Sequence, residues 1–275
     1  MNENEWKQQL PWGAKFHPMP KYDDCLLTYL DILGFSKMIE ESVSNPAKIE
    51  RIIEILIEME RQTSLGARDG SSNALTQNFS DLIIRAVPLE EPSEFITKIN
   101  IECLILASIQ CKLLLDNSVL IRGGICYDKI YMEQGLAFGP ALVKSHHLAE
   151  HVSVYPRVIV DPKVAAMHDV SAELPLRSLY LRQGDDGAYF LDYLSIGFMF
   201  QVNFFPKYES PIAVALKHKE RVEEKLSELK SHERIRQKAL WLAIYHNHAV
   251  RRIMGFANFK YHAALQSCLI PEPHE

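Results

Sequence analysis

One feature constrains the fold of this chain most: an apolar run ends at a carboxylate, and a helical pattern follows at once. Residues 25–31 are predicted to form a strand that ends on Asp31, and a helical pattern begins at residue 35. A second carboxylate, Asp81, stands in a polar turn between the two short apolar runs of residues 74–87, which predict a β-hairpin. Two carboxylates, each held at a strand end or in a hairpin turn, can share a pair of divalent cations.

Strand and helix patterns alternate along most of the chain. Helices are predicted over residues 35–43, 46–62, 94–116 and 139–151, and strands over residues 25–31, 119–131, 157–160, 179–182 and 188–193. The order β-α-α-β-β-α-β inserts a hairpin into a split β-α-β unit. It predicts an α+β fold with a ferredoxin-like or palm core, in which helices cover an antiparallel sheet. Gly123 and Gly124, inside a predicted strand, indicate a close backbone approach or a bulge.

Composition divides the chain into three segments. Residues 1–23 contain three prolines and a glycine and are predicted to be irregular. Residues 24–200 carry the alternating pattern and are predicted to form the main domain. Residues 201–275 are predicted to be a helical C-terminal extension, because lysines and glutamates recur at helical spacing over residues 217–230. The extension could cover the sheet or strengthen a dimer. Residues 65–72 are predicted to be a Gly/Ser-rich loop.

Charge and cysteine usage exclude several classes of function. Proteins that bind a nucleic acid backbone are usually basic, whereas the formal net charge of this chain is −5, so we expect no nucleic acid partner. The five cysteines include no CxxC pair and are expected to be reduced thiols of a cytoplasmic protein. No stretch of about 18 uncharged apolar residues is present, and the N-terminus is polar, so neither a membrane span nor a signal peptide is expected.

Four short blocks carry a family resemblance. Residues 30–36 read Leu-Asp-Ile-Leu-Gly-Phe-Ser, residues 79–81 Phe-Ser-Asp, residues 121–125 Ile-Arg-Gly-Gly-Ile, and residues 139–143 Gly-Pro-Ala-Leu-Val. In order and spacing they resemble the catalytic domain of the class III nucleotidyl cyclases over about residues 25–195. The family motifs are an Asp-Ile-x-Gly-Phe-Thr/Ser strand end, an Ile-Gly-Asp hairpin, an Arg-x-Gly-Ile strand and a Gly-x-x-Val-Asn helix.

The resemblance implies a two-metal site for phosphoryl transfer. Asp31 and Asp81 would be the catalytic carboxylates and would bind two divalent cations, Mn²⁺ or Mg²⁺, with the carbonyl oxygen of Ile32 as a further ligand. The backbone N–H groups of Leu33, Gly34, Phe35 and Ser36 would cradle phosphate oxygens at a helix start. Attack of the ribose 3′-oxygen on the α-phosphate of a nucleoside triphosphate would then give a cyclic nucleotide and pyrophosphate.

The base-selecting positions depart from those of the purine cyclases. Gln77 stands where those enzymes have Lys or Glu, and its amide can donate and accept. Leu136 stands where they have Asp, Thr or Cys, and its side chain cannot hydrogen-bond. With intact metal carboxylates, this pair resembles the bacterial pyrimidine cyclases of the Pycsar anti-phage systems. That likeness implies cyclic UMP or cyclic CMP as product, with UTP slightly favoured over CTP.

Further residues follow from the same resemblance. The family's transition-state Asn and Arg fall at Val143 and His147, and Lys144 could replace the Asn. The lysine that holds the leaving phosphates falls near Arg182, with Arg157 as a second candidate. The family builds its site between two subunits, which implies a head-to-tail homodimer. A separate effector protein would read the product.

Other functions stay open at this point. Loss of the Asn at position 143 favours a degenerate cyclase-like sensor that binds a nucleotide without turning it over. A purine cyclase would keep the mechanism and change the base. A diguanylate cyclase would show a Gly-Gly-Asp/Glu-Glu-Phe hairpin, which residues 78–81 do not match. A purely structural helical oligomer would leave both aspartate motifs unexplained.

Overall fold

The computed structural model describes residues 21–64, 73–133, 135–171, 180–200, 207–228, 233–256 and 261–271. The predicted irregular segment up to residue 20, the predicted loop over residues 65–72 and the predicted start of the C-terminal extension at residues 201–206 lie outside the described residues.

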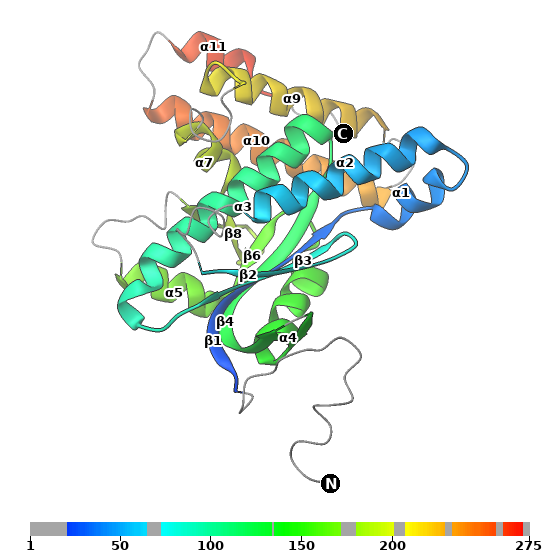
Figure 1. Ribbon diagram of the computed structural model, residues 1–275. Helices are drawn as coiled ribbons and strands as arrows, with labels where there is room; N and C mark the ends of the chain where they lie inside the picture. The colour runs from blue at the N-terminus through cyan, green and yellow to red at the C-terminus, as the bar shows by residue number, and fades with distance from the viewer. Residues whose placement is uncertain are drawn as a thin grey trace, which may run out of the picture.

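A mixed, mostly antiparallel sheet forms the centre of an α+β fold (Figure 1). The strands run in the order β2-β3-β1-β4-β6-β8-β7, and β5 pairs with β4. The pairing of β4 with β6 is parallel and the others are antiparallel. Their bounds are β1 Asp23–Ile32, β2 Leu75–Phe79, β3 Leu82–Pro88, β4 Ile121–Glu133, β5 Leu136–Phe138, β6 Val158–Val160, β7 Leu181–Gln183 and β8 Tyr189–Leu191.

Helices cover both faces of this sheet. Their bounds are α1 Phe35–Ser42, α2 Pro46–Thr63, α3 Phe95–Asn117, α4 Pro140–His147, α5 Pro162–Ser171, α7 Tyr193–Met199, α9 Pro211–Glu228, α10 Glu233–Phe256 and α11 His262–Ser267, with a short 3₁₀ turn η2 at Pro92–Glu94 and a π-helical turn η3 at Leu148–Val152. Helices α9, α10 and α11 lie together at one end of the molecule (Figure 1). They share one continuous hydrophobic core with the sheet and α3.

Two neighbouring residues of β1 show that α3 and α4 lie on opposite faces. The hydroxyl of Thr28 donates to Glu102 of α3. The ring of Tyr29 meets that of His146 on α4, with 5.4 Å between the ring centroids. Successive side chains of a strand point to opposite faces. Residues 29 and 31 therefore share the face that α4 covers.

A buried ion pair joins the strands to the helices on the α3 face. Arg85 of β3 donates from Nε to both oxygens of Glu102, at 3.0 and 2.8 Å, and from a terminal nitrogen to the Thr63 carbonyl oxygen at 2.6 Å. Both charged side chains are 1% exposed. Four elements, β1, β3, α2 and α3, thus meet at one satisfied polar cluster.

Gly124 lets α4 approach β4 closely. A Cβ atom at this position would lie 2.4 Å from the carbonyl oxygen of Ser145 and 2.6 Å from the Cβ of Leu148. Only glycine avoids that collision. The close backbone approach predicted from the paired glycines is confirmed.

The structure adds elements that the residue pattern did not predict. Helix α5 follows Asp161, whose carboxylate accepts from the Lys163 N–H at 2.6 Å and so caps the helix start. The strand predicted over residues 188–193 is shorter, because Asp192 caps helix α7 by accepting from the Ser195 N–H. The predicted helix over residues 139–151 changes from α to π geometry after His147. Among the described helices, none combines the length and apolar character of a membrane span.

A buried hydrogen-bonded chain connects α7, α9, α10 and the end of α11. Tyr193 Oη lies 2.8 Å from His218 Nε2, His218 Nδ1 lies 3.0 Å from His246 Nδ1, and His246 Nε2 lies 2.9 Å from the Cys268 carbonyl oxygen. A carbonyl oxygen can only accept, so His246 donates from Nε2 and accepts at Nδ1. His218 then donates from Nδ1 and accepts from the Tyr193 hydroxyl, which leaves both rings neutral.

Acid should therefore destabilise the fold through this histidine pair. Burial lowers the pKa of His218 well below its usual range and that of His246 to about 4. Their contribution is complete above the unfolded-state pKa of about 6.5 and is lost as the pH falls from there. The free energy of unfolding should drop by about 1.4 kcal/mol per pH unit for each histidine. Urea unfolding between pH 7.5 and 5 measures this slope.

His246→Gln removes one titrating ring and should make the slope shallower. His248→Gln, on the exposed side of α10, should keep the wild-type slope. An unchanged slope in His246→Gln would contradict the assignment.

Candidate active site

The structure brings the two predicted metal carboxylates together. Asp31 lies near the end of β1, and Asp81 is the second residue of the two-residue turn between β2 and β3. Strand β3 pairs with β1 in the register Leu30 opposite Ile83, which sets the hairpin turn beside the end of β1. The carboxyl groups of Asp31 and Asp81 are close enough to share a hydrogen bond.

An arginine and a further carboxylate complete this cluster. Arg122 of β4 is paired directly opposite Asp31 and donates from Nε to its Oδ2 at 2.8 Å. A terminal nitrogen of the same guanidinium group donates to Glu150. The π-helical turn η3 carries Glu150. The predicted site residues omitted both Arg122 and Glu150. Arg122 belongs to the Arg-Gly-Gly-Ile block, so the sequence offered a signal for it. No residue pattern predicted the π turn that carries Glu150.

The environment of Asp31 disfavours its negative charge. Burial raises the pKa of the Asp31 carboxyl group to about 6. Arg122 counteracts this shift, and the neighbouring Asp81 adds to it. A partly buried pair of carboxylates with one arginine has an excess of negative charge, which a divalent cation would neutralise.

The available ligands fit a hard divalent cation bound mainly through its substrate. Carboxylate oxygens of Asp31 and Asp81 are ligands that Mg²⁺ and Mn²⁺ accept, and Ile32 ends β1 beside them. Within the described ranges, no three His, Cys, Asp or Glu side chains form a metal cluster. Mg²⁺ commonly takes one or two carboxylates and completes its shell with substrate phosphates and water.

One predicted phosphate contact is wrong. The Leu33 N–H donates to the Leu120 carbonyl oxygen at 2.9 Å, so it is not available to a phosphate group. Gly34 adopts a left-handed conformation with φ of 83° and precedes the first turn of α1. Phe35 and Ser36 occupy the first two positions of that helix, where N–H groups have no partner within the helix. The cradle is thus shorter than the resemblance implied.

The two predicted base-selecting residues are neighbours. Gln77 of β2 donates from Nε2 to the Leu136 carbonyl oxygen at 3.2 Å. The other amide atom of Gln77, Oε1, is buried and has no hydrogen-bond partner among the described residues. Gln77 is opposite Ile84, which is opposite Tyr29, so Gln77 shares the sheet face of Asp31.

The remaining predicted phosphate contacts come from α4 and β7. Lys144 forms an ion pair with the buried Asp161. His147 is exposed on α4, with its ring centroid 5.0 Å from that of His151. Arg182 Nε lies 3.4 Å from the buried Asp192 carboxylate, on a strand four places from β1 in the sheet. Four strand spacings are about 19 Å, so Arg182 does not reach Asp31 within one subunit.

Comparison with known proteins adds no family name. Neither a protein-family model nor a curated protein sequence matches this chain.

Replacing Asp31 with Asn should stabilise the metal-free protein above neutral pH. The raised pKa means that ionised Asp31 is unfavourable in the folded state, and this penalty grows as the pH rises through about 6. Asn removes the charge and keeps an oxygen that can accept from Arg122. In EDTA, calorimetry should give a higher Tm for Asp31→Asn than for the wild type at pH 8, and a smaller difference at pH 5.

Asp24→Asn, at the exposed start of the same strand, is the matched control and should show no such pH dependence. A lower Tm for Asp31→Asn at pH 8 without metal would refute the electrostatic account of the cluster.

Proposed function

We propose that this chain is a nucleotidyl cyclase that converts a pyrimidine nucleoside triphosphate, UTP slightly ahead of CTP, into its 3′,5′-cyclic nucleotide and pyrophosphate. The meeting of Asp31 and Asp81, from two separate elements, is the observation that carries the proposal. The antiparallel order β2-β3-β1-β4, with helices in both crossovers, supports a ferredoxin-like or palm core of the cyclase type.

The chain's own residues have separate tasks in this reaction. Bound divalent cations, Mn²⁺ or Mg²⁺, would supply positive charge against the triphosphate and acidify the ribose 3′-hydroxyl. Asp31 and Asp81 hold them through carboxylate oxygens. Arg122 keeps the Asp31 carboxylate oriented through its 2.8 Å hydrogen bond. The ribose 3′-hydroxyl would release its proton to water, and its oxygen would form the new bond to the α-phosphorus as the bond to the pyrophosphate leaving group breaks.

The polarity of Gln77 limits which base edge it can read. Its Nε2 is engaged by the Leu136 carbonyl oxygen, which leaves Oε1 as an acceptor. A base facing Oε1 must present a donor, such as the N3–H of uracil or the amino group of cytosine. The Leu136 side chain adds no hydrogen bond. Both pyrimidines meet this requirement, so the acceptor does not decide between UTP and CTP.

A second copy of the chain would complete the site. Arg182 lies too far from Asp31 in its own subunit and would contact phosphates bound by the other subunit, as would Lys144 and His147. Leu136 and Phe138 of β5 and Val143 of α4 are 45%, 49% and 72% exposed and offer an apolar face for a head-to-tail homodimer. The product would be read by a separate effector in cytoplasmic anti-phage signalling.

Product formation should depend on both carboxylates. Purified protein is incubated with Mn²⁺ and each of ATP, GTP, CTP and UTP, and the products are identified by mass spectrometry. We expect a cyclic pyrimidine nucleotide from the wild type. Asp31→Asn and Asp81→Asn should lose more than about 100-fold in rate, beyond the 10–100-fold typical of losing an outer-shell partner. Asp24→Asn should be unaffected.

The outcomes separate the competing functions. Wild-type rates in either site variant would refute the two-metal assignment. A cyclic purine product would keep the mechanism and overturn the role given to Gln77 and Leu136. Nucleotide binding without any product would favour the degenerate sensor, which the Val143 position already suggests.

Gln77→Lys should change the base preference. The substitution replaces the acceptor Oε1 with an ammonium donor, so the kcat/KM ratio of UTP to CTP should fall. Asn78→Ser alters the next residue of β2, which points to the opposite face, and should leave the ratio unchanged. Equal ratios in the wild type and Gln77→Lys would remove Gln77 from the base pocket.

A further inference from the structure

Glu150 is the one carboxylate of the cluster around Asp31 without a task in the proposed reaction. It lies in η3, the π-helical turn, and such turns are rare and occur frequently at functional sites. Its side chain is 31% exposed and accepts a hydrogen bond from Arg122 of β4. The same guanidinium group donates to Asp31, so a single arginine connects Glu150 to a proposed metal ligand.

The turn that carries Glu150 is fixed to the sheet by hydrogen bonds. The Ser153 N–H donates to the Leu148 carbonyl oxygen at 2.8 Å across the π turn, and the Ser153 hydroxyl donates to the Arg157 carbonyl oxygen at 2.6 Å. The Gly123 N–H of β4 donates to that same Arg157 oxygen at 3.2 Å. The backbone around Glu150 is therefore held in place relative to β4.

Arg122 divides its donors between two carboxylates. An arginine beside a single carboxylate frequently binds both of its oxygens with two nitrogens. Here Nε of Arg122 donates to Oδ2 of Asp31 at 2.8 Å, and a terminal nitrogen donates to Glu150. Among the described residues, Arg122 thus donates to one oxygen of Asp31. The second oxygen of this carboxylate remains for a cation.

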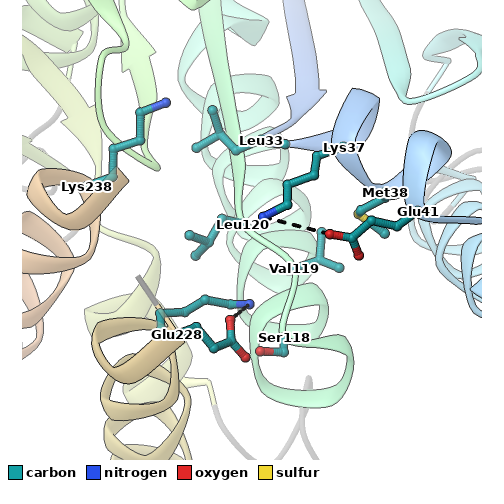
Figure 2. Close-up of a pocket in the computed structure, with 11 residues that line it drawn as sticks. Leu33, Lys37, Met38, Glu41, Ser118, Val119, Leu120, Glu228 and Lys238 are labelled. Carbon is teal, nitrogen blue, oxygen red and sulfur yellow. Dashed lines mark hydrogen bonds and ion pairs between the residues drawn. The ribbon is translucent and has the colours of Figure 1, made fainter. Parts of the chain in front are cut away.

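A cavity elsewhere in the molecule shows the more ordinary arrangement of charges. It has a volume of about 390 Å³ and lies between α1 and the C-terminal helices. Figure 2 shows Glu41 directed at Lys37, and Glu228 pairs with Lys225 at 3.1 Å. Each of these glutamates has a lysine on its own helix. Around Arg122 the ratio is reversed, because two carboxylates depend on one cation.

We propose that Glu150 is a positioning residue, which sets the cation affinity of Asp31 by holding Arg122 in this divided contact. The inference rests on the proposed metal site. Without Glu150, the guanidinium group would turn two donors onto Asp31 and compete with the cation for the second oxygen. Glu150 does not touch the cation and acts through Arg122.

Mn²⁺ binding without nucleotide tests this role. The full-length protein is titrated with Mn²⁺, and the free ion is measured by electron paramagnetic resonance. Glu150→Gln keeps the shape of the side chain and removes its charge, so it should weaken Mn²⁺ binding about 10–100-fold, the loss typical of an outer-shell partner. Asp31→Asn should abolish this binding, which locates the measured ion. Glu224→Gln, which removes a glutamate from its pair with Arg221 on α9, is the matched control and should keep the wild-type affinity.

Two further variants separate position from charge. Glu150→Asp keeps the charge but shortens the side chain by one methylene group, which draws it away from Arg122, so it should also weaken Mn²⁺ binding. In Arg122→Gln no guanidinium group remains to be held. Adding Glu150→Gln to that variant should therefore change the affinity much less. We expect a coupling of at least about fivefold between the two substitutions, within the range for residues in contact.

The outcomes are decided by affinity and not by turnover. Equal Mn²⁺ affinity in Glu150→Gln and the wild type, or an equal loss with and without the Arg122 guanidinium group, would overturn the proposal. So would a wild-type protein without Asp31-dependent Mn²⁺ binding, which would also refute the proposed metal site. The expected pattern of affinities in a protein that forms no cyclic nucleotide would refute the cyclase activity and support the role of Glu150.

Discussion

The buried pair of Arg85 and Glu102 determines how the proposed site comes together. Arg85 belongs to the hairpin that carries Asp81, and Glu102 also accepts from Thr28 on the strand that carries Asp31. A slip of one residue between β1 and β3 would turn every side chain of the hairpin to the other face. It would also leave the charge of Arg85 or Glu102 buried without its partner, and breaking a buried pair in this way costs about 3–5 kcal/mol. The pair therefore penalises any register in which the two aspartates fail to meet.

On the opposite face of the sheet, which α4 covers, carboxylates outnumber the arginine that they surround. Asp31 and Glu150 share the single guanidinium group of Arg122, and Asp81 adds its charge beside Asp31. Such an arrangement is unfavourable for stability alone and is typical of a functional site, where perturbed carboxylates gather. The buried residues on the α3 face thus keep the strands in register, and the charged residues on the α4 face form the proposed site.

Residue patterns predicted the elements that bear the site and missed contacts that depend on distant segments. Asp31 could be found because a strand, a glycine and a helix follow one another, and Asp81 because a polar turn separates two apolar runs. Glu150 could not, since it reaches Arg122 from a π turn that packs against the distant strand β4. The loss of the Leu33 N–H has a similar origin, because its acceptor Leu120 is far along the chain. Short elements such as β5 and α7 depend on tertiary pairing and caps more than on periodicity.

Gly124 has a mechanical consequence for this cluster. At that point the backbone of β4 lies against the carbonyl oxygen of Ser145, the Cβ of Leu148 and the backbone nitrogen of Ala149. Side chains can change rotamer and absorb a small displacement, whereas peptide groups in contact cannot, and protein interiors have low compressibility. A movement of β4 perpendicular to the sheet would therefore also move the turn that carries Glu150. Arg122, two residues from Gly124 on the same strand, would move with it, so the carboxylate, the guanidinium group and the turn behave as one rigid unit.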